Sequence, residues 1–217
     1  MAEIEKTETK PQSLAVKILL RHAKENIPEM RLLFGGGKLK GDWGNVTNHQ
    51  LVQAAAGLIV SEALALPTDQ TEVLFRAILV HDWNKRLDIR PGDFGTDDLA
   101  KAESLLQTVN PDVSLIESTS PGFHDKIING EATLLQKLQY YLDDITRGEE
   151  IAPLEDRLAE VAVRRSDLDA DFWARELQAG EIVEQELFQV LKEKGIEIDK
   201  PADIPSWINS KLNGKYG

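Results

Sequence analysis

Apolar residues recur at spacings of three and four along almost the whole chain, and this periodicity constrains the fold more than any other feature. Leu51, Ala54 and Leu58 follow it within the segment 48–67, as expected for one face of a helix. No segment has the sustained alternation of polar and apolar residues that predicts a strand. The sequence therefore predicts an all-α fold, a compact bundle of many helices.

Proline, glycine and helix-capping residues divide this pattern into separate helices. The glycine-rich segment 35–45 and the segment 88–95 predict loops. Helices are expected over about 13–26, 48–67, 68–81, from 96 onward, briefly after 111, over 129–146, from 153 onward, over 168–194 and near 204–212.

The length of 217 residues suits one domain with additions. Residues 1–12 are charged and predict a disordered tail, residues 13–165 predict the main helical domain, and residues 166–217 predict a helical extension packed on that domain. The helix over 180–195 has an apolar face, which we expect to dock on the same chain. A homodimer is the alternative.

Composition excludes several classes of function. The chain has no cysteine, which rules out disulfides, thiolate metal sites and a cysteine nucleophile. Its 25 Lys and Arg against 37 Asp and Glu give a net charge of −12, which opposes broad nucleic-acid binding but allows a small anionic substrate. Without an apolar run long enough for a membrane span or a secretory signal, the expected location is the cytoplasm.

The segment 75–86, FRAILVHDWNKR, places His81 and Asp82 at the end of a strongly apolar helix. A buried carboxylate without a partner costs several kcal/mol, so Asp82 needs a strong partner or belongs to a site. The simplest alternative is a helix-end pair, with His81 near the negative end of the helix dipole and Asp82 bound to a neighbour.

The helix expected over 129–146 carries Asp143 on the face opposite its apolar stripe. Gln136, Gln139 and Tyr140 share that face at spacings of seven, four and three. A face that is polar but uncharged up to Asp143 is unusual for solvent and suits the wall of a wet cavity.

Taken in order, His49, His81 with Asp82, and Asp143 resemble the signature of the HD-domain metal-dependent phosphohydrolases. That signature is a histidine, a His-Asp pair and a distant aspartate. His49 lies 32 residues before His81, and Asp143 lies 61 residues after Asp82, which fits the usual layout. The resemblance covers roughly residues 45–160.

The segment HDWNKR is similar to the family's commoner His-Asp-Ile-Gly-Lys form and keeps its lysine, Lys85. It departs from that form at Trp83 and Asn84. A bulky indole beside the ligands could narrow the pocket, so these departures leave room for a non-catalytic sensor that kept the fold.

The block YYLDDITRGEEIAPLEDR, residues 140–157, resembles a bacterial subgroup of the same family and matches it through Arg157. Its register makes Asp143 the terminal ligand, with Asp144 as the alternative. Arg147, just beyond, is a candidate phosphate contact, although a basic residue there also suits the end of a helix.

The resemblance implies a divalent metal ion held by His49, His81, Asp82 and Asp143. Such a set of imidazoles and carboxylates suits manganese, iron, cobalt, nickel or zinc, with magnesium as a further option. In this scheme Asp82 also helps to take the proton from the attacking water. Members with two metals generally have two further histidines before the terminal aspartate, and this chain has His124 alone. A single ion is therefore expected, with His124 as a substrate contact or proton donor.

The function implied is hydrolysis of small phosphorylated molecules, nucleotides first, by metal-activated water. Lys85 is expected to act at the catalytic site and to bind phosphate, and Arg86 is a second phosphate candidate; both could instead be surface charges. A phosphodiesterase acting on cyclic nucleotides or oligonucleotides is the alternative within the family. His22 lies outside the resemblance and is expected to be structural.

Overall fold

The computed structural model describes residues 12–22, 29, 44–83, 85 and 96–217. This part of the chain is helical apart from one short hairpin, which confirms the predicted all-α bundle. The predicted tail, except for its last residue, and most of the two predicted loops lie outside the described residues. The helices are α1 (Leu14–His22), α3 (Gly44–Leu64), α4 (Thr68–Val80), α6 (Thr96–Val109), α7 (Val113–Glu117), α8 (His124–Ile128), α9 (Leu134–Ile145), α10 (Leu154–Arg164), α11 (Ala170–Glu193), the 3₁₀ turn η2 (Pro201–Asp203) and α12 (Ile204–Tyr216).

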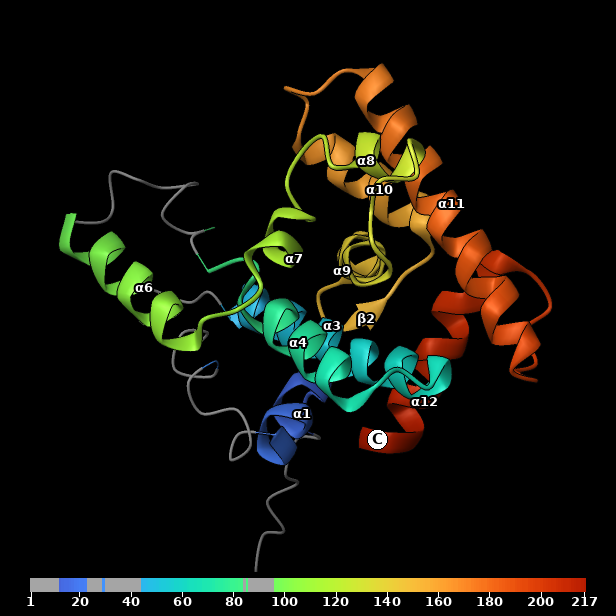
Figure 1. Ribbon diagram of the computed structural model, residues 1–217, viewed down its shortest axis with the longest axis horizontal. Helices are drawn as coiled ribbons and strands as arrows, with labels where there is room; N and C mark the ends of the chain where they lie inside the picture. The colour runs from blue at the N-terminus through green and yellow to red at the C-terminus, as the bar shows by residue number, and fades with distance from the viewer. Residues whose placement is uncertain (1–11, 23–28, 30–43, 84, 86–95) are drawn as a thin grey trace, which may run out of the picture.

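Helix α9 lies in the middle of the molecule, and α3, α4, α7, α10 and α11 all contact it (Figure 1). Its predicted apolar stripe accounts for this position, because Leu138, Tyr141, Leu142 and Ile145 are fully buried. Only Leu134, at the first turn, is half exposed. Burial of such a face stabilises a helix far more than propensity does.

The helix expected over 129–146 starts later than predicted. Gly130 adopts a φ of +73°, in the left-handed region that a residue without a Cβ reaches easily, and this breaks the chain after α8. The hydroxyl of Thr133 then accepts from the backbone N–H of Gln136, whose side chain accepts from the N–H of Thr133. This capping box starts α9.

Helices α3 and α4 pack closely at Gly57, in a stretch of α3 that consists of small residues. Ala54, Ala55 and Ala56 are completely buried, and a Cβ built on Gly57 would lie 2.7 Å from Cδ1 of Ile78. Helix α4 has the predicted start, whereas α3 begins four residues earlier than expected. Helix α3 and the residue directly after α4 supply the two histidines of the site described below.

A hairpin that the sequence did not predict connects α9 to α10. Strand β1 (Thr146–Arg147) pairs antiparallel with β2 (Glu150–Ile151) across a turn in which Gly148 has a φ of +59°. The side chain of Asn209 in α12 completes the pairing, because it accepts from the N–H of Ile151 and donates to its carbonyl. Two-residue strands are too short for a pattern of alternation to be visible.

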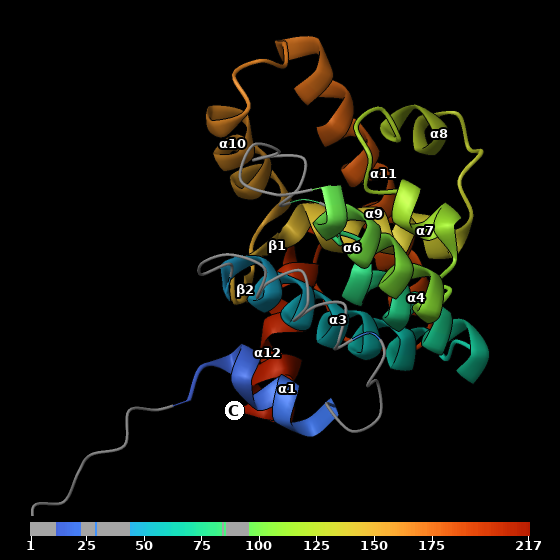
Figure 2. The same ribbon diagram turned by 90° about the vertical axis from the view of Figure 1, so that its left-hand side faces the viewer.

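The last helices close the bundle. Helix α11 packs along α8, α9 and α10, while α12 packs on α3 and α1, so the C-terminus lies beside the first helix (Figure 2). Ile204, Ile208, Leu212 and Tyr216 of α12 are buried in the same core as α3. No helix in the described part of the chain is both long and apolar enough to cross a membrane.

Candidate metal centre and adjoining pocket

Three side chains that are distant in the sequence meet where α3, α4 and α9 come together. His49 comes from α3, His81 directly follows α4, and Asp143 lies in the last turn of α9; one donor atom of each lies within 4.8 Å of the other two. Nε2 of His49 is 2.8 Å, and Nε2 of His81 is 3.3 Å, from Oδ1 of Asp143. We call these three residues the His-His-Asp cluster.

His81 is oriented as a metal-binding histidine would be. Its Nδ1 lies 2.8 Å from the carbonyl oxygen of Ile78, one turn earlier. Since a carbonyl only accepts, Nδ1 carries a hydrogen, and in the neutral ring Nε2 keeps its lone pair. Nε2 is buried and lies 3.3 Å from Oδ1 of Asp143, but it makes no hydrogen bond of acceptable geometry among the described residues. A metal ion at the cluster would satisfy this atom, and a backbone carbonyl behind a ligand histidine is a common support.

The electrostatics of the cluster also favour a cation. Burial opposes a charge on His81, but the carboxylates of Asp82 and Asp143 outweigh it and raise the pKa of His81 to about 9. Burial likewise works against ionisation of Asp143, yet His81 and His49 hold the pKa of its carboxyl well below the ordinary value. Two imidazoles and a carboxylate form a mixed nitrogen and oxygen donor set that suits several divalent transition metals.

Asp82, the fourth ligand suggested by the family resemblance, lies beside the cluster. Its Oδ2 is 3.6 Å from Nε2 of His81 and 2.5 Å from Nζ of Lys85. Lys85 is therefore the strong partner that the sequence required for Asp82. The three converging donors do not include Asp82, and its role as a ligand stays a prediction.

His124 is not brought to the cluster. Its imidazole is buried, with Nδ1 2.9 Å from Oε1 of Glu176 and Nε2 3.3 Å from Oδ1 of Asp125. It contacts Glu176, which lines the pocket described next, but His124 itself does not line that pocket. Its expected part as a substrate contact or proton donor has no support from this position.

The other candidates are also placed away from the cluster or lie outside the described residues. Arg147 is exposed and pairs with Glu150 across the hairpin. It does not line the pocket, so the hairpin ion pair accounts for it better than a phosphate does. His22 contacts the hydroxyl of Tyr216 at 3.0 Å, consistent with the structural role expected. Arg86 lies outside the described residues.

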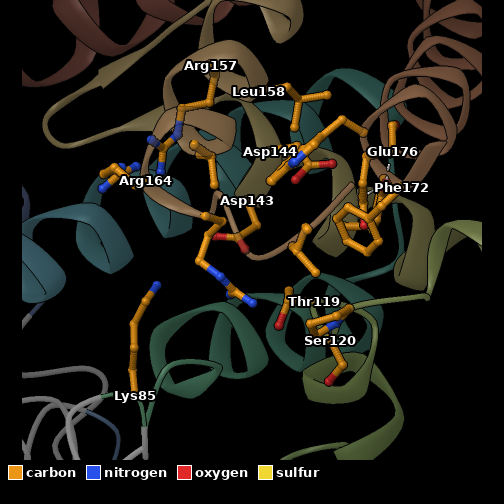
Figure 3. A pocket seen from close by; sticks show the side chains of 16 residues that line it. Lys85, Thr119, Ser120, Asp143, Asp144, Arg157, Leu158, Arg164, Phe172 and Glu176 are labelled. Atoms are coloured by element: carbon orange, nitrogen blue, oxygen red, sulfur yellow. Dashed lines mark hydrogen bonds between the residues drawn. The ribbon is translucent and has the colours of Figure 1, made fainter. Parts of the chain in front are cut away.

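Asp143 also lines a pocket of about 570 Å³, a volume within the range of small-molecule sites. The end of α9, one face of α10, the start of α11 and the loop before α8 surround it. Figure 3 shows Lys85, Arg157 and Arg164 on one side of Asp143, with Asp144 and Glu176 on the other. The pocket is thus cationic on one side and acidic on the other.

Arg157 is the most buried of the arginines that line the pocket. Its side chain is 15% exposed, against 58% for Arg164 and 48% for Arg165. Burial and the nearby Arg164 lower the pKa of Arg157, and its buried Nε has no acceptor in the described structure. The sequence singled out Arg157 only as the end of a matching block and gave it no role.

The acidic side centres on Tyr140, whose hydroxyl donates to Glu176. Burial, together with Asp144 and Glu176, raises the pKa of the Tyr140 hydroxyl well above its ordinary value. Burial and the neighbouring Glu176 also raise the pKa of Asp144 well above its ordinary value. Sequence reasoning missed Glu176, because it belongs to α11, outside the segment that resembles the HD-domain family.

No known protein-family model, curated protein or solved structure matches this chain. The proposals that follow therefore depend on the His-His-Asp cluster and its pocket.

Proposed function

We propose that this chain is a metal-dependent phosphohydrolase of small phosphorylated molecules, with the HD-domain type of site. The observation that carries the proposal is the double position of Asp143. It belongs to the buried His-His-Asp cluster and also forms part of the wall of a pocket that contains four cationic side chains. A metal activator and an anion-binding surface are thus adjacent.

A divalent ion held by His49, His81 and Asp143 would supply Lewis-acid activation of water and of a phosphoryl oxygen. The protein holds these three donors in place through α3, the Ile78 carbonyl behind His81, and the buried end of α9. The donors come from the rigid core of the bundle, which favours a fixed geometry.

Lys85 and Arg157 are the groups that we expect to hold the phosphate. The buried Nε of Arg157 has no acceptor among the described residues, and a phosphate oxygen would provide one. Lys85 lines the same pocket and also fixes the Asp82 carboxylate. We infer that Asp82, 3.6 Å from His81, accepts the proton of the attacking water.

The test is phosphate release from a panel of nucleoside monophosphates, sugar phosphates and p-nitrophenyl phosphate, with protein stripped of metal and then supplied with each divalent ion in turn. Asp143→Asn is expected to lower kcat/KM by roughly 100-fold or more, because it removes a ligand at the centre of the cluster. Asp199→Asn, at an exposed position beyond α11, is the matched control and is expected to keep full activity.

Two outcomes would overturn the proposal: full activity of Asp143→Asn, or no phosphate released from any substrate with any ion. Faster cleavage of bis-(p-nitrophenyl) phosphate than of the monoester would identify a phosphodiesterase instead. Tight binding without turnover would identify a sensor.

A further inference from the structure

The acidic side of the pocket has more hydrogen-bond acceptors than donors. Two side chains donate hydrogen bonds there, the hydroxyl of Tyr140 and Nδ1 of His124, and both donate to Glu176. Arg157 is close enough for its charge to oppose the burial that raises the pKa of Asp144, but its buried Nε makes no hydrogen bond among the described residues. Tyr140 has a single hydroxyl hydrogen, so it cannot serve Asp144 at the same time. Oδ2 of Asp144 is buried and has no hydrogen-bond partner in the described part of the chain.

An unpaired carboxyl oxygen in a buried place is costly, so native structures rarely leave one without a hydrogen-bond partner. In Figure 3 the cationic groups Lys85, Arg157 and Arg164 lie on one side of Asp143, and Asp144 and Glu176 lie on the other. Asp144 itself lines the pocket. A donor carried by the occupant of the pocket is therefore the partner that best fits its position.

Aromatic and aliphatic side chains form the walls around this end. Phe172 and Trp173, at the start of α11, stand edge to face with ring centroids 5.1 Å apart. Tyr140 and Leu158 line the same pocket. A flat ring has favourable contacts with such walls, both by apolar burial and by aromatic packing.

We propose that Asp144 is a specificity-determining residue, which selects phosphorylated compounds that carry an amino group on an aromatic ring. The phosphate lies toward Lys85 and Arg157, and the amino group donates to Asp144 beside Glu176. Nucleotides with an amino-bearing base, such as adenine or cytosine, have this chemistry. The phosphate end of this inference rests on the function proposed above, whereas the amino end rests on the unpaired Asp144.

The test is calorimetric binding to the full chain in the presence of Mn²⁺. The ligands are nucleoside phosphonates in which carbon replaces the ester oxygen, so that turnover cannot occur. Each amino compound is paired with a relative without that group: adenosine with purine riboside, and cytidine with uridine. A hydrogen bond to a buried acceptor that is otherwise unpaired predicts about tenfold or more tighter binding of the amino member. Phosphoethanolamine, an amine without a ring, is expected to bind more weakly than either amino nucleotide.

Two variants separate recognition by Asp144 from a merely structural role. Asp144→Leu removes the acceptor, and the affinity ratio of each pair should fall to about one. Asp144→Asn adds a donor that suits the uracil oxygen, and the preference for cytidine over uridine should fall by about tenfold or reverse. Circular dichroism and bound Mn²⁺ are measured for both variants, to show that the fold and the neighbouring Asp143 are intact.

Equal affinities within both pairs in the unaltered chain, or ratios that neither variant changes, would overturn the inference, as would no binding by any nucleotide phosphonate. Equal binding of phosphoethanolamine would overturn its aromatic part. Failure of this inference can be distinguished from failure of the proposed function. Phosphate release without discrimination between pair members leaves a phosphohydrolase without this selectivity. If the chain binds the amino member of each pair more tightly but hydrolyses no phosphate, the pocket recognises the amino group and the proposed enzymatic function is wrong.

Discussion

At the scale of single residues, the buried ionisable groups are held by a few specific contacts. Nδ1 of His81 is satisfied within its own helix, which leaves Nε2 for the cluster. A second buried acid lies away from the site: Glu184 of α11 accepts from the hydroxyl of Tyr141 at 2.7 Å, and both side chains are buried. Burial raises the pKa of Glu184 above its ordinary value, although the Tyr141 hydroxyl opposes this.

Glu184 should therefore make stability depend on pH. A carboxyl whose pKa is raised by folding binds its proton more tightly in the native state, so its contribution is complete below the unfolded pKa near 4.5 and is lost as pH rises through the folded value. Glu184→Gln keeps an acceptor for Tyr141 and cannot ionise. We expect the free energy of unfolding of the unaltered chain, relative to this variant, to fall as pH rises through that window. Urea unfolding at a series of pH values measures it; a constant difference contradicts the assignment.

At the scale of elements, α10 and α11 approach each other closely at Gly180. A Cβ built there would lie 2.6 Å and 2.9 Å from the two terminal methyl carbons of Leu154, which is itself buried. Gly214, in the last turns of α12, has nothing within 4 Å of its built Cβ. Both glycines are helical, but only Gly180 faces a closely packed neighbour.

Gly180→Ala should destabilise the fold by about 1–3 kcal/mol, because overpacking outweighs the gain in helix propensity of up to about 1 kcal/mol. Gly214→Ala is the matched control and should be neutral or slightly stabilising. Thermal and urea unfolding of both variants provides the comparison. If Gly180→Ala is as stable as its control, α10 and α11 are not packed as described.

The sequence predicted the elements best where a proline marks an end, as at Pro67 before α4 and Pro153 before α10. Thr68 is the first residue of α4, and its hydroxyl does not cap the helix. The sequence failed where the signal was a single backbone conformation. Gly130 ends one helix before α9 begins, and the hairpin around Gly148 has strands of only two residues. Neither the break at Gly130 nor the hairpin alters the periodicity of apolar residues, so this periodicity could not predict them.

At the scale of the whole molecule, the site depends on helices that converge from distant parts of the chain. His49, His81 and Asp143 could be proposed because their order and spacing resemble a known signature, and the structure brings them together. Asp144 and Glu176 could not be assigned to a pocket from sequence. An acidic residue on a helix is usually solvated, and only the packing of α11 against α8 and α9 buries Glu176.

Helix α12 packs into the same core as α3. A substitution that removes part of this packing should therefore destabilise the entire fold. Ile208 is completely buried, and Ile208→Ala should cost about 2–5 kcal/mol. We expect one cooperative transition, in which the fluorescence of Trp207 in α12 and the helical circular dichroism signal shift together; Trp43, Trp83 and Trp173 are replaced by Phe in both chains so that Trp207 alone is observed. A separate early transition of the fluorescence would show that α12 is an independent unit.

The most direct measurement is the amount of divalent ion that the purified chain retains after equilibrium dialysis against Mn²⁺, Co²⁺ or Zn²⁺, determined by elemental analysis. Asp143→Asn and Asp144→Asn are compared because the two aspartates are neighbours on α9 and only Asp143 belongs to the His-His-Asp cluster. We predict a single bound ion in the unaltered chain and in Asp144→Asn, and its loss in Asp143→Asn. No ion in the unaltered chain, or an ion retained undiminished by Asp143→Asn, would contradict a metal centre built from His49, His81 and Asp143.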